Sequence, residues 1–480
     1  MRYIAVFLLL SGCMVGPNYE VPENDVPDTW SQESCDDAVV TKWWELFNDR
    51  LLNQYIEEAV SYNRDVRAAE ANVLQAIALR QVVASNLYPM VGADFNGART
   101  YFSKNGPVFA IGPAAGSLPG TVSGATGLPF SLQVPQTQNL YNFLFDASWE
   151  IDLFGKTRRS IEAADAQIGG AIERKNDILL SIMAEVARNY MELRSAQLLA
   201  ILTEKNIELL EKSGAIICES FQQGYVNRLI YERIEADLLS AKSKLPPLIS
   251  SVHKSIYAIS VLTGQLPENL LPELLPLSSL PKAPQGVSVG LRSDLLRRRP
   301  DIRRAERELA AATANIGVAV ASFFPTITLF GDGGLQSLQF SKLFEAGSKT
   351  WALGGDAMTP VFQGGQLLGQ LDANKAATKG ALDSYEQTVL NALQETEKYL
   401  TTYNQDLKVV EELSERTKKY QILSSLSESR YQNGLINLLD QIDVERELIL
   451  AEQSLLQSET TSLLDLISLY KALGGGWESE

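Results

Sequence analysis

The chain has 480 residues, 45% of them hydrophobic and 21% charged, which is enough for several folded domains. Its 58 acidic residues outnumber its 42 basic residues, and the formal net charge is −16. Nucleic-acid binding relies on a basic surface, so this balance argues against a nucleic-acid partner.

The N-terminus has the pattern of a lipoprotein signal. Arg2 precedes the apolar run Ile4–Leu10, and the sequence Leu-Ser-Gly-Cys ends at Cys13. The run is too short to span a bilayer as a helix, which needs about 20 residues, so residues 1–12 are predicted to be a signal peptide that is removed. We expect a covalent lipid on Cys13 and no other cofactor; the alternative is a chance cysteine after a simple secretory signal. Because Met14 rather than aspartate follows, the expected location is the outer membrane of a Gram-negative envelope.

The remaining sequence gives no disulfide framework and no further long apolar stretch. Once Cys13 is acylated, only Cys35 and Cys218 remain, and two thiols so far apart give no pattern to interpret. Since no apolar stretch of membrane-spanning length follows the signal, any membrane crossing must be made by strands. Residues 13–49 are expected to form a lipidated N-terminal extension.

Two halves of the chain resemble each other, which predicts an internal repeat. The sequence Asn-Arg-Asp-Val-Arg-Ala-Ala-Glu at 63–70 corresponds to Arg-Pro-Asp-Ile-Arg-Arg-Ala-Glu at 299–306, about 236 positions later. Tyr88-Pro89 and Phe324-Pro325 show the same displacement, and a displacement of about 210 relates Gly224 to Gly434. The predicted parts are repeat 1 at 50–264, a proline-rich linker at 265–291, repeat 2 at 292–474 and a tail at 475–480.

Each repeat is predicted to contain a helix, a β-hairpin, a very long helix and a return helix. The predicted helices are 50–88, 156–224, 227–262, 292–324, 365–434 and 438–473. The two longest have no internal proline and, at 1.5 Å per residue, would each be roughly 100 Å long, which fits a coiled coil, a helical repeat or a helical tube. Pro246 and Pro247 are predicted to break or kink the first return helix.

The hairpins, predicted at about 91–152 and 326–360, show the alternation of strands. In the clearest strand the apolar residues are Tyr141, Phe143, Phe145, Ala147, Trp149 and Ile151, with mostly polar residues between them. One face of such a strand suits lipid and the other suits water. A soluble β-sandwich gives the same alternation, but the context of this chain favours the membrane.

Strands in a membrane must close into a barrel, because hydrocarbon cannot satisfy open edges, and small barrels have at least eight strands. Four strands from one chain cannot close such a barrel. The predicted fold is therefore mostly α-helical, with four strands per chain that share a membrane β-barrel with other copies. A homotrimer would supply a twelve-stranded barrel.

Five stretches resemble the TolC-like outer-membrane factors, lipoprotein branch. They are Val15–Tyr19, Trp43-Trp44, Ser148–Arg159, Asp294–Ile302 and Leu473–Trp477. The resemblance implies a trimeric barrel on a long antiparallel α-helical tunnel, with a periplasmic adaptor, an inner-membrane pump and outer-membrane lipid as partners. It implies the exit duct of a tripartite efflux system for small molecules such as drugs or toxic compounds; a duct for type I protein secretion is the alternative.

The family closes its periplasmic end with helical tips and acidic rings, and the matching stretch here is 434–443. Asp440 and Asp443, one turn apart on one helix face, would form two carboxylate rings in a trimer, with Leu439 as an apolar constriction beside them. The alternative is that both are ordinary solvated carboxylates and that Leu439 makes a coiled-coil contact. The equivalent positions of repeat 1, Ile230 and Arg233, lack the acidic pair.

The tips and two tryptophans complete the candidate residues. Gly224 with Asn227, and Gly434 with Asn437, supply the turn residues that let a helix reverse, and we expect these tips to contact the adaptor. Trp149 and Trp351 are predicted to lie in the membrane-interface belt; ordinary barrel packing is the alternative.

Two other classes of protein fit less well. An enzyme is disfavoured because His253 is the only histidine, no nucleophile elbow is present, and no metal ligands cluster. A structural coiled-coil lipoprotein would explain the long helices and Cys13 but not the alternating strands in both halves. The basic run Arg297–Arg299 is expected to form structural ion pairs.

Overall fold

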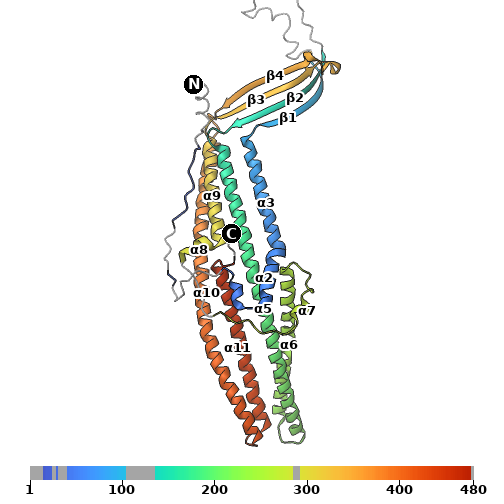
Figure 1. Cartoon of the computed structure of the whole chain (residues 1–480), viewed down its shortest axis with the longest axis vertical. Coiled ribbons are helices and arrows are strands. Elements are labelled where there is room, and N and C mark those ends of the chain that lie inside the picture. Colours follow the sequence, from blue (N-terminus) through green and yellow to red (C-terminus); the bar gives the residue numbers. More distant parts are fainter. Residues whose placement is uncertain (1–13, 24–28, 31–40, 104–135, 285–291, 477–480) are drawn as a thin grey trace, which may run out of the picture. The chain divides into compact units, whose positions relative to one another are not determined.

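The computed structural model describes residues 14–23, 29–30, 41–103, 136–284 and 292–476 (Figure 1). The chain forms two compact units. Unit 1 comprises Met1–Asn18, Leu79–Ala164 and Thr313–Ala376, and unit 2 comprises Tyr19–Ala78, Asp165–Ala312 and Ala377–Glu480. Each unit therefore collects segments from both repeats.

Unit 1 contains a four-stranded antiparallel sheet in the order β1-β2-β3-β4 (Figure 1). The strands are β1 (Met90–Tyr101), β2 (Thr137–Ile151), β3 (Thr326–Ser337) and β4 (Lys349–Met358). The strands of each hairpin pair with each other, and β2 pairs with β3 to join the hairpins. Between β3 and β4 lie two short 3₁₀ helices, η4 (Phe340–Lys342) and η5 (Ala346–Ser348). The predicted four strands are confirmed.

The long helices and the return helices have the same lengths in the two repeats. α5 (Lys156–Gln222) and α10 (Gln366–Gln432) contain 67 residues each, and α6 (Arg228–Leu262) and α11 (Leu438–Ala472) contain 35 each. α6 packs along α5 through a small apolar cluster that includes Ile217 and Ile234. α11 lies beside α10, where the Thr417 hydroxyl donates to the carbonyl of Ala451 at 3.4 Å. This correspondence supports the internal repeat.

The helix expected at 50–88 is divided into α2 (Arg50–Tyr62), α3 (Arg64–Ala84) and the 3₁₀ helix η2 (Ser85–Leu87). Asn63 separates α2 from α3, because its Oδ1 accepts hydrogen bonds from the N–H groups of Asp65 and Val66 and so caps α3.

The helix expected at 292–324 is divided in the same way, into α8 (Arg292–Arg298) and α9 (Pro300–Ala321). The proline after Arg299 disfavours helical backbone at that residue. Asn63 and Arg299 are equivalent positions of the repeat, so the two breaks are one structural feature that occurs twice.

Of the predicted break or kink in the first return helix, the break is wrong, since α6 continues through Pro246 and Pro247; a kink stays a prediction. Each proline removes a helical N–H and leaves the carbonyl four residues earlier without its donor. The two prolines and the residues that carry these carbonyls, Lys242 and Ser243, are all exposed. Water can therefore satisfy the freed carbonyls, and the helix continues.

The main core of unit 2 contains the 3₁₀ helix η1 (Trp43–Phe47) and the short helix α7 (Leu271–Leu274). Trp43, which is 0% exposed, stacks on Tyr470 with 5.5 Å between ring centroids. Its Nε1 donates to the carbonyl of Gly475 at 3.2 Å. Two stretches that carry the family resemblance, Trp43-Trp44 and the C-terminal end, thus pack on each other.

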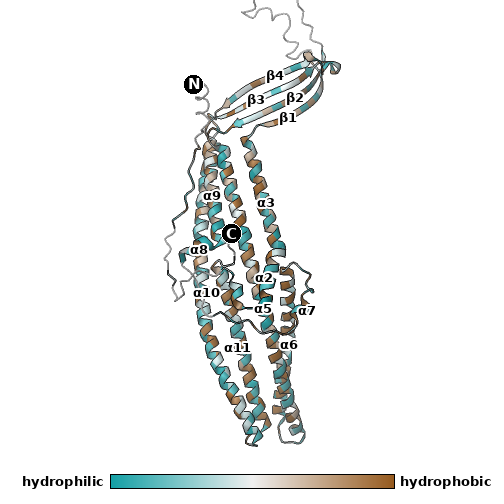
Figure 2. Cartoon of the chain, viewed as in Figure 1, coloured by the Kyte–Doolittle hydropathy of each residue, from teal (hydrophilic) through white to brown (hydrophobic). Residues whose placement is uncertain are grey.

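Hydrophobic and hydrophilic residues alternate along the helices, and none of the long helices is hydrophobic throughout (Figure 2). In the part of the chain that the structure describes, no helix is both long enough and apolar enough to cross a membrane.

Candidate functional site

The sheet has two chemically different faces. Residues directly opposite each other on neighbouring strands point to the same side, and the register therefore assigns every residue to a face. The large apolar residues on one face are Val91, Phe95, Tyr101, Tyr141, Phe143, Phe145, Trp149, Ile151, Ile327, Leu329, Leu335, Trp351 and Leu353. Arg99 and Lys349 interrupt this face.

The other face carries amides and carboxylates, with Leu140, Leu144 and Phe330 among them. Asn142 links three strands, since its Nδ2 donates to Asn96 Oδ1 and its Oδ1 accepts from Gln336 Nε2, both at 2.9 Å. Asp146 and Asp332 lie directly opposite each other on β2 and β3. Like charges at such positions repel unless water or cations screen them, so this face is suited to an aqueous environment.

Both tryptophans of the predicted interface belt lie on the apolar face. Trp149 is near the end of β2 that leads into α5, and its Nε1 donates to the carbonyl of Leu87 at 2.9 Å. Trp351 is near the start of β4 and is 75% exposed. An indole that is apolar at one end and hydrogen-bonded at the other suits a membrane interface, although the belt itself stays a prediction.

The two tips have the same turn geometry. Gly224 and Gly434 follow α5 and α10 with φ of 77° and 72°, a left-handed conformation that favours glycine. Their neighbours close the turn: the N–H of Tyr225 donates to Ser220, and that of Leu435 to Arg430, each at 2.9 Å. These hydrogen bonds satisfy carbonyls in the last turn of each helix that would otherwise lack a donor.

The return helices begin with equivalent caps. Asn227 Oδ1 accepts from the N–H of Ile230 at 3.1 Å, and Asn437 Oδ1 accepts from the N–H of Asp440 at 2.9 Å. Such a cap satisfies one of the free N–H groups at a helix start. The turn chemistry predicted for both tips is therefore present; that the tips contact an adaptor stays a prediction.

The acidic pair lies in the first two turns of α11. Asp440 and Asp443 are both exposed, and an Asp443 Oδ1 to Arg446 Nη1 distance of 3.6 Å makes a weak surface ion pair. Leu439 is half-buried and packs against the apolar cluster of α5 and α6. In a single chain, Leu439 thus makes the helix-packing contact that was the alternative to a constriction, and both carboxylates are exposed; the gate itself stays a prediction.

Cys13, the predicted lipidation site, lies outside the described residues, but Arg159 holds the segment that follows it. Arg159 is 1% exposed and donates to the carbonyls of Val15 and Gly16, each at 3.1 Å, and to Asn18 Oδ1 at 2.9 Å. The N–H of Val15 donates to Phe154 at 3.2 Å. Two further stretches of the family resemblance therefore contact each other through one buried guanidinium.

Arg299, the last residue of the basic run before α9, has a structural role. Arg299 pairs with Asp301 at 2.7 Å and with Glu395 at 2.9 Å, and its Nη1 donates to the terminal carbonyl of α11 at Ala472. Asn63 makes the same contact in repeat 1, to the carbonyl of Leu262 at 2.9 Å. Ion pairing at Arg299 is confirmed. No sequence pattern predicted its contact with the return helix.

The residues that could support enzyme chemistry are dispersed. Across the described ranges, no group of three or more His, Cys, Asp or Glu residues is placed to hold a metal ion. His253 lies on α6, with its ring 5.9 Å from that of Tyr257. Cys218 is a free thiol, and Cys35 lies outside the described residues.

Comparison with known proteins gives consistent likenesses. The family model described as outer membrane efflux protein matches residues 55–265 and 291–475. The antibiotic efflux pump outer membrane protein ArpC of Pseudomonas putida is 30% identical over 482 residues, which cover 98% of this chain and 94% of the relative. The outer-membrane channel OprN has a TM-score of 0.82 at 30% identity and covers 97% of this chain and 100% of its own. The open state of the Neisseria gonorrhoeae MtrE outer membrane channel has a TM-score of 0.79 at 28% identity, covering 97% of this chain and 98% of its own.

These likenesses extend over nearly the whole chain and include both repeats. They confirm the resemblance to the TolC-like outer-membrane factors and the predicted fold class. The protein is an outer-membrane channel of the efflux class, and the class consists of channels rather than enzymes. The chain thus belongs to the outer membrane efflux protein family.

Proposed function

We propose that three copies of this chain assemble into the exit duct of a tripartite efflux system. In this assembly the sheets of three copies close one membrane barrel, and the long helices form a water-filled tunnel below it. A periplasmic adaptor joins the helical tips to an inner-membrane pump. Cys13 carries the lipid that anchors the duct in the outer membrane, where several acyl chains make the anchoring stable.

The observation that carries this proposal is the chemistry of the sheet. Four antiparallel strands present one face that is mainly apolar and one face that carries the amides and carboxylates, and β1 and β4 are edge strands. In hydrocarbon, each backbone N–H or C=O group left unpaired at a strand edge costs several kcal/mol. This is about the cost of burying an amide without a hydrogen bond. Assembly with other copies removes the edges and gives the polar face a water-filled lumen.

The substrates we propose are small toxic compounds, including antibiotics. The support is the relative ArpC, which is named an antibiotic efflux protein. The duct would pass what the pump delivers, so its own selectivity would rest on size and charge. Asp440 and Asp443 form the periplasmic constriction in this proposal, because threefold repetition brings six exposed carboxylates close to one axis.

Single-channel recording in planar bilayers tests both parts of the proposal. The purified protein should give small, cation-selective openings, and the double variant Asp440→Asn with Asp443→Asn should give larger or more frequent openings. Glu219→Gln, which removes an exposed carboxylate from the other tip, is the matched control and should behave as the wild type.

The possible results separate the alternatives. A folded, membrane-inserted protein that never conducts would favour the structural lipoprotein over the duct. Conductance that the acidic double variant leaves unchanged would keep the duct and remove the proposed gate. Divalent cations should reduce the wild-type current and act less on the double variant, because carboxylate rings bind them.

A further inference from the structure

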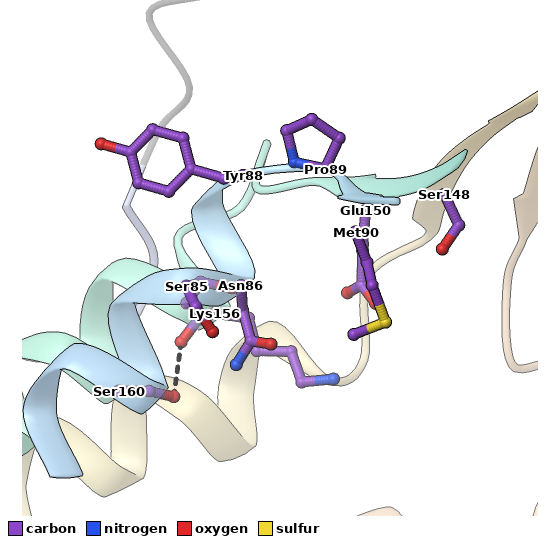
Figure 3. Close-up of a pocket in the computed structure, with 10 residues that line it drawn as sticks. Ser85, Asn86, Tyr88, Pro89, Met90, Ser148, Glu150, Lys156 and Ser160 are labelled. Carbon is purple, nitrogen blue, oxygen red and sulfur yellow. Dashed lines mark hydrogen bonds between the residues drawn. The ribbon is translucent and has the colours of Figure 1, made fainter. Parts of the chain in front are cut away.

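A cavity of about 530 Å³ lies at the base of the first hairpin, where the strands meet the helices (Figure 3). It is formed by η2, the ends of β1 and β2 and the start of α5, all of which belong to unit 1. Met90 lies opposite Ser148, and Glu150 follows on the same side of β2. The cavity is therefore on the sheet face that carries the amides and carboxylates, and its volume is in the range that holds small ligands.

Two opposite charges extend into this cavity from different elements. Figure 3 shows the Lys156 ammonium group, from α5, and the Glu150 carboxylate, from β2, on either side of the same space. Across the described residues, no ion pair includes either of them. Arg158 is already paired with Asp152 at 3.2 Å, and the Asp152 carboxylate also accepts from two N–H groups at the start of α5. One cation and one anion thus remain available to a ligand.

Neutral hydrogen-bonding groups line the cavity between the two charges. In the part of the chain that the structure describes, the side chains of Asn86 and Ser148 make no hydrogen bond. The hydroxyl groups of Ser85 and Ser160 donate to backbone carbonyls at 2.7 Å and 2.9 Å, and each keeps its oxygen as an acceptor. Met90 adds an apolar surface. The lining therefore suits a polar solute that carries both signs of charge.

The second repeat provides an internal comparison. Lys156 and Gln366 are the first residues of α5 and α10, 210 positions apart, and the same displacement relates Glu150 to Pro360. The second hairpin is joined to its long helix without either charge. The two charges of the first repeat are thus not required by this kind of strand-to-helix connection, and the fold does not explain them.

We propose that this cavity is a transient binding site for zwitterionic solutes of drug size that pass through the duct. Lys156 binds the anionic group of the solute, and Glu150 binds its ammonium group. This inference rests on the proposed function and names a substrate class for it. The site lies on the face assigned to the lumen, so its occupant is a dissolved compound and not a membrane lipid. Binding is weak, because conduction requires that a bound solute leaves again.

Equilibrium dialysis of the full-length protein in phosphatidylglycerol nanodiscs tests the site. The probe is ciprofloxacin, which is a zwitterion at pH 7. Its ethyl ester, a cation, and nalidixic acid, an anion, are the one-charge comparators, and both should bind more weakly than ciprofloxacin. Lys156→Gln and Glu150→Gln should each weaken ciprofloxacin binding by roughly tenfold, the factor for one hydrogen bond to a charged group. Equal binding of the three probes would overturn the proposal.

Matched variants separate the site from the general charge of the sheet face. Asp356 lies in line with Glu150 across the sheet, since both are opposite Thr328, but it does not line the cavity. Asp356→Asn should leave ciprofloxacin binding unchanged, and so should Lys342→Gln, which removes an exposed lysine of unit 1. The double variant Lys156→Glu with Glu150→Lys should restore the binding that each single loss weakens, because a zwitterion can bind in reverse. Losses of binding in Asp356→Asn as large as in Glu150→Gln would overturn the site.

Two further measurements identify the source of the ligand and separate the site from the duct. Phosphatidylethanolamine added to the nanodiscs should not displace ciprofloxacin; displacement would make a lipid headgroup the occupant and overturn the proposal. In planar bilayers, ciprofloxacin should interrupt the wild-type current more often than that of Lys156→Gln. A protein that conducts but does not bind ciprofloxacin would refute the site and keep the duct. A protein that binds it selectively but never conducts would support the site and remove the proposed function.

Discussion

Single buried side chains connect the separate stretches of sequence that carry the family resemblance. Arg159 holds the segment after the predicted lipidation site, Trp43 holds the C-terminal end, and Arg299 holds the end of the last helix. Each uses a buried polar group whose hydrogen bonds go to backbone carbonyls far away in the sequence. A buried guanidinium is tolerated only when its donors are satisfied, so these contacts limit what each position and its partner can be.

The Arg159 contact leads to a prediction about the N-terminal segment. Arg159→Lys removes the planar fork that serves four acceptors at once, on Val15, Gly16, Asn18 and Glu162. Residues 14–18 should therefore lose protection in hydrogen exchange, most of all at the Val15 amide. The free energy of unfolding should fall by about 2 kcal/mol, as for lost hydrogen bonds to a charged group. Arg174→Lys on the same helix is exposed and should change neither quantity. Unchanged exchange at Val15 would show that the guanidinium is not what fixes the segment.

At the scale of elements, the two tips depend on glycine for backbone reasons alone. At Gly224 and Gly434 an added Cβ would meet nothing within 4 Å, so the only penalty of a side chain is the left-handed conformation. That penalty is about 1 kcal/mol or somewhat more for each residue. The tips can thus vary in side chains around a fixed turn, which suits a surface that meets a partner.

Alanine substitutions separate this backbone effect from packing. Gly224→Ala and Gly434→Ala should each lower the free energy of unfolding by about 1 kcal/mol, whereas Gly214→Ala, inside α5 and also without neighbours within 4 Å, should raise it by roughly 0.5–1 kcal/mol. Thermal unfolding in detergent measures all three. Destabilisation by all three variants would mean that a contact absent from a single chain occupies these positions.

The contact between α10 and α11 includes a pair of carboxyl groups. Burial, and then the neighbouring carboxyl of Asp465, raise the pKa of Asp406 to about 6 from its ordinary value of 3.8. The folded state therefore binds a proton more tightly than the unfolded state does. By linkage, the stabilisation from this proton is complete below pH 3.8 and is lost as the pH rises through 6.

Asp406→Asn should consequently raise the thermal midpoint above pH 7, where Asp406 of the wild type is ionised. Near pH 4.5 the gain should be small, because Asp406 is then largely protonated. The stability profiles of variant and wild type measured between pH 4.5 and 8 test this; curves that stay parallel would refute the role of Asp406. Glu415→Gln is a suitable control, since Lys418 lowers the pKa of that exposed carboxyl and the pair lies at the surface.

The sequence predicted those elements whose position is determined by residues close together in the chain. The strands follow from alternation and the tips from Gly224 and Gly434, and both are found where expected. The break at Asn63 could not be predicted, because in a sequence an asparagine that caps a new helix looks the same as an asparagine inside a continuous helix. Pro246 and Pro247 gave a misleading signal, since their effect depends on whether the freed carbonyls face water.

For the candidate site, too, only residues with a local sequence signal could be predicted. The acidic pair and the glycines came from spacing and resemblance, whereas Arg159 carries no periodic signal and its partners lie more than 140 residues away. The register between strands that are distant in sequence was likewise invisible.

At the scale of the whole molecule, the charge of the chain and the polarity of the sheet point to one property. The net charge is −16, and the carboxylates Asp146 and Asp332 lie opposite each other on the face proposed to line the lumen. In a trimer the threefold axis would repeat this pair around the barrel. The field of such a ring attracts cations and excludes anions, and salt screens it within about 10 Å at 0.1 M.

The double variant Asp146→Asn with Asp332→Asn should therefore reduce cation selectivity without changing how often the channel opens. Asparagine keeps the size and hydrogen bonding of the side chain, so folding is preserved while the charge is lost. In a potassium chloride gradient the reversal potential should move toward zero, most strongly at low salt, where screening is weakest. Glu57→Gln, an exposed carboxylate on α2 far from the sheet in the sequence, should leave the reversal potential unchanged. If the double variant conducts with the wild-type reversal potential, the face with the amides and carboxylates does not line the ion path. The apolar face could then no longer be assigned to lipid.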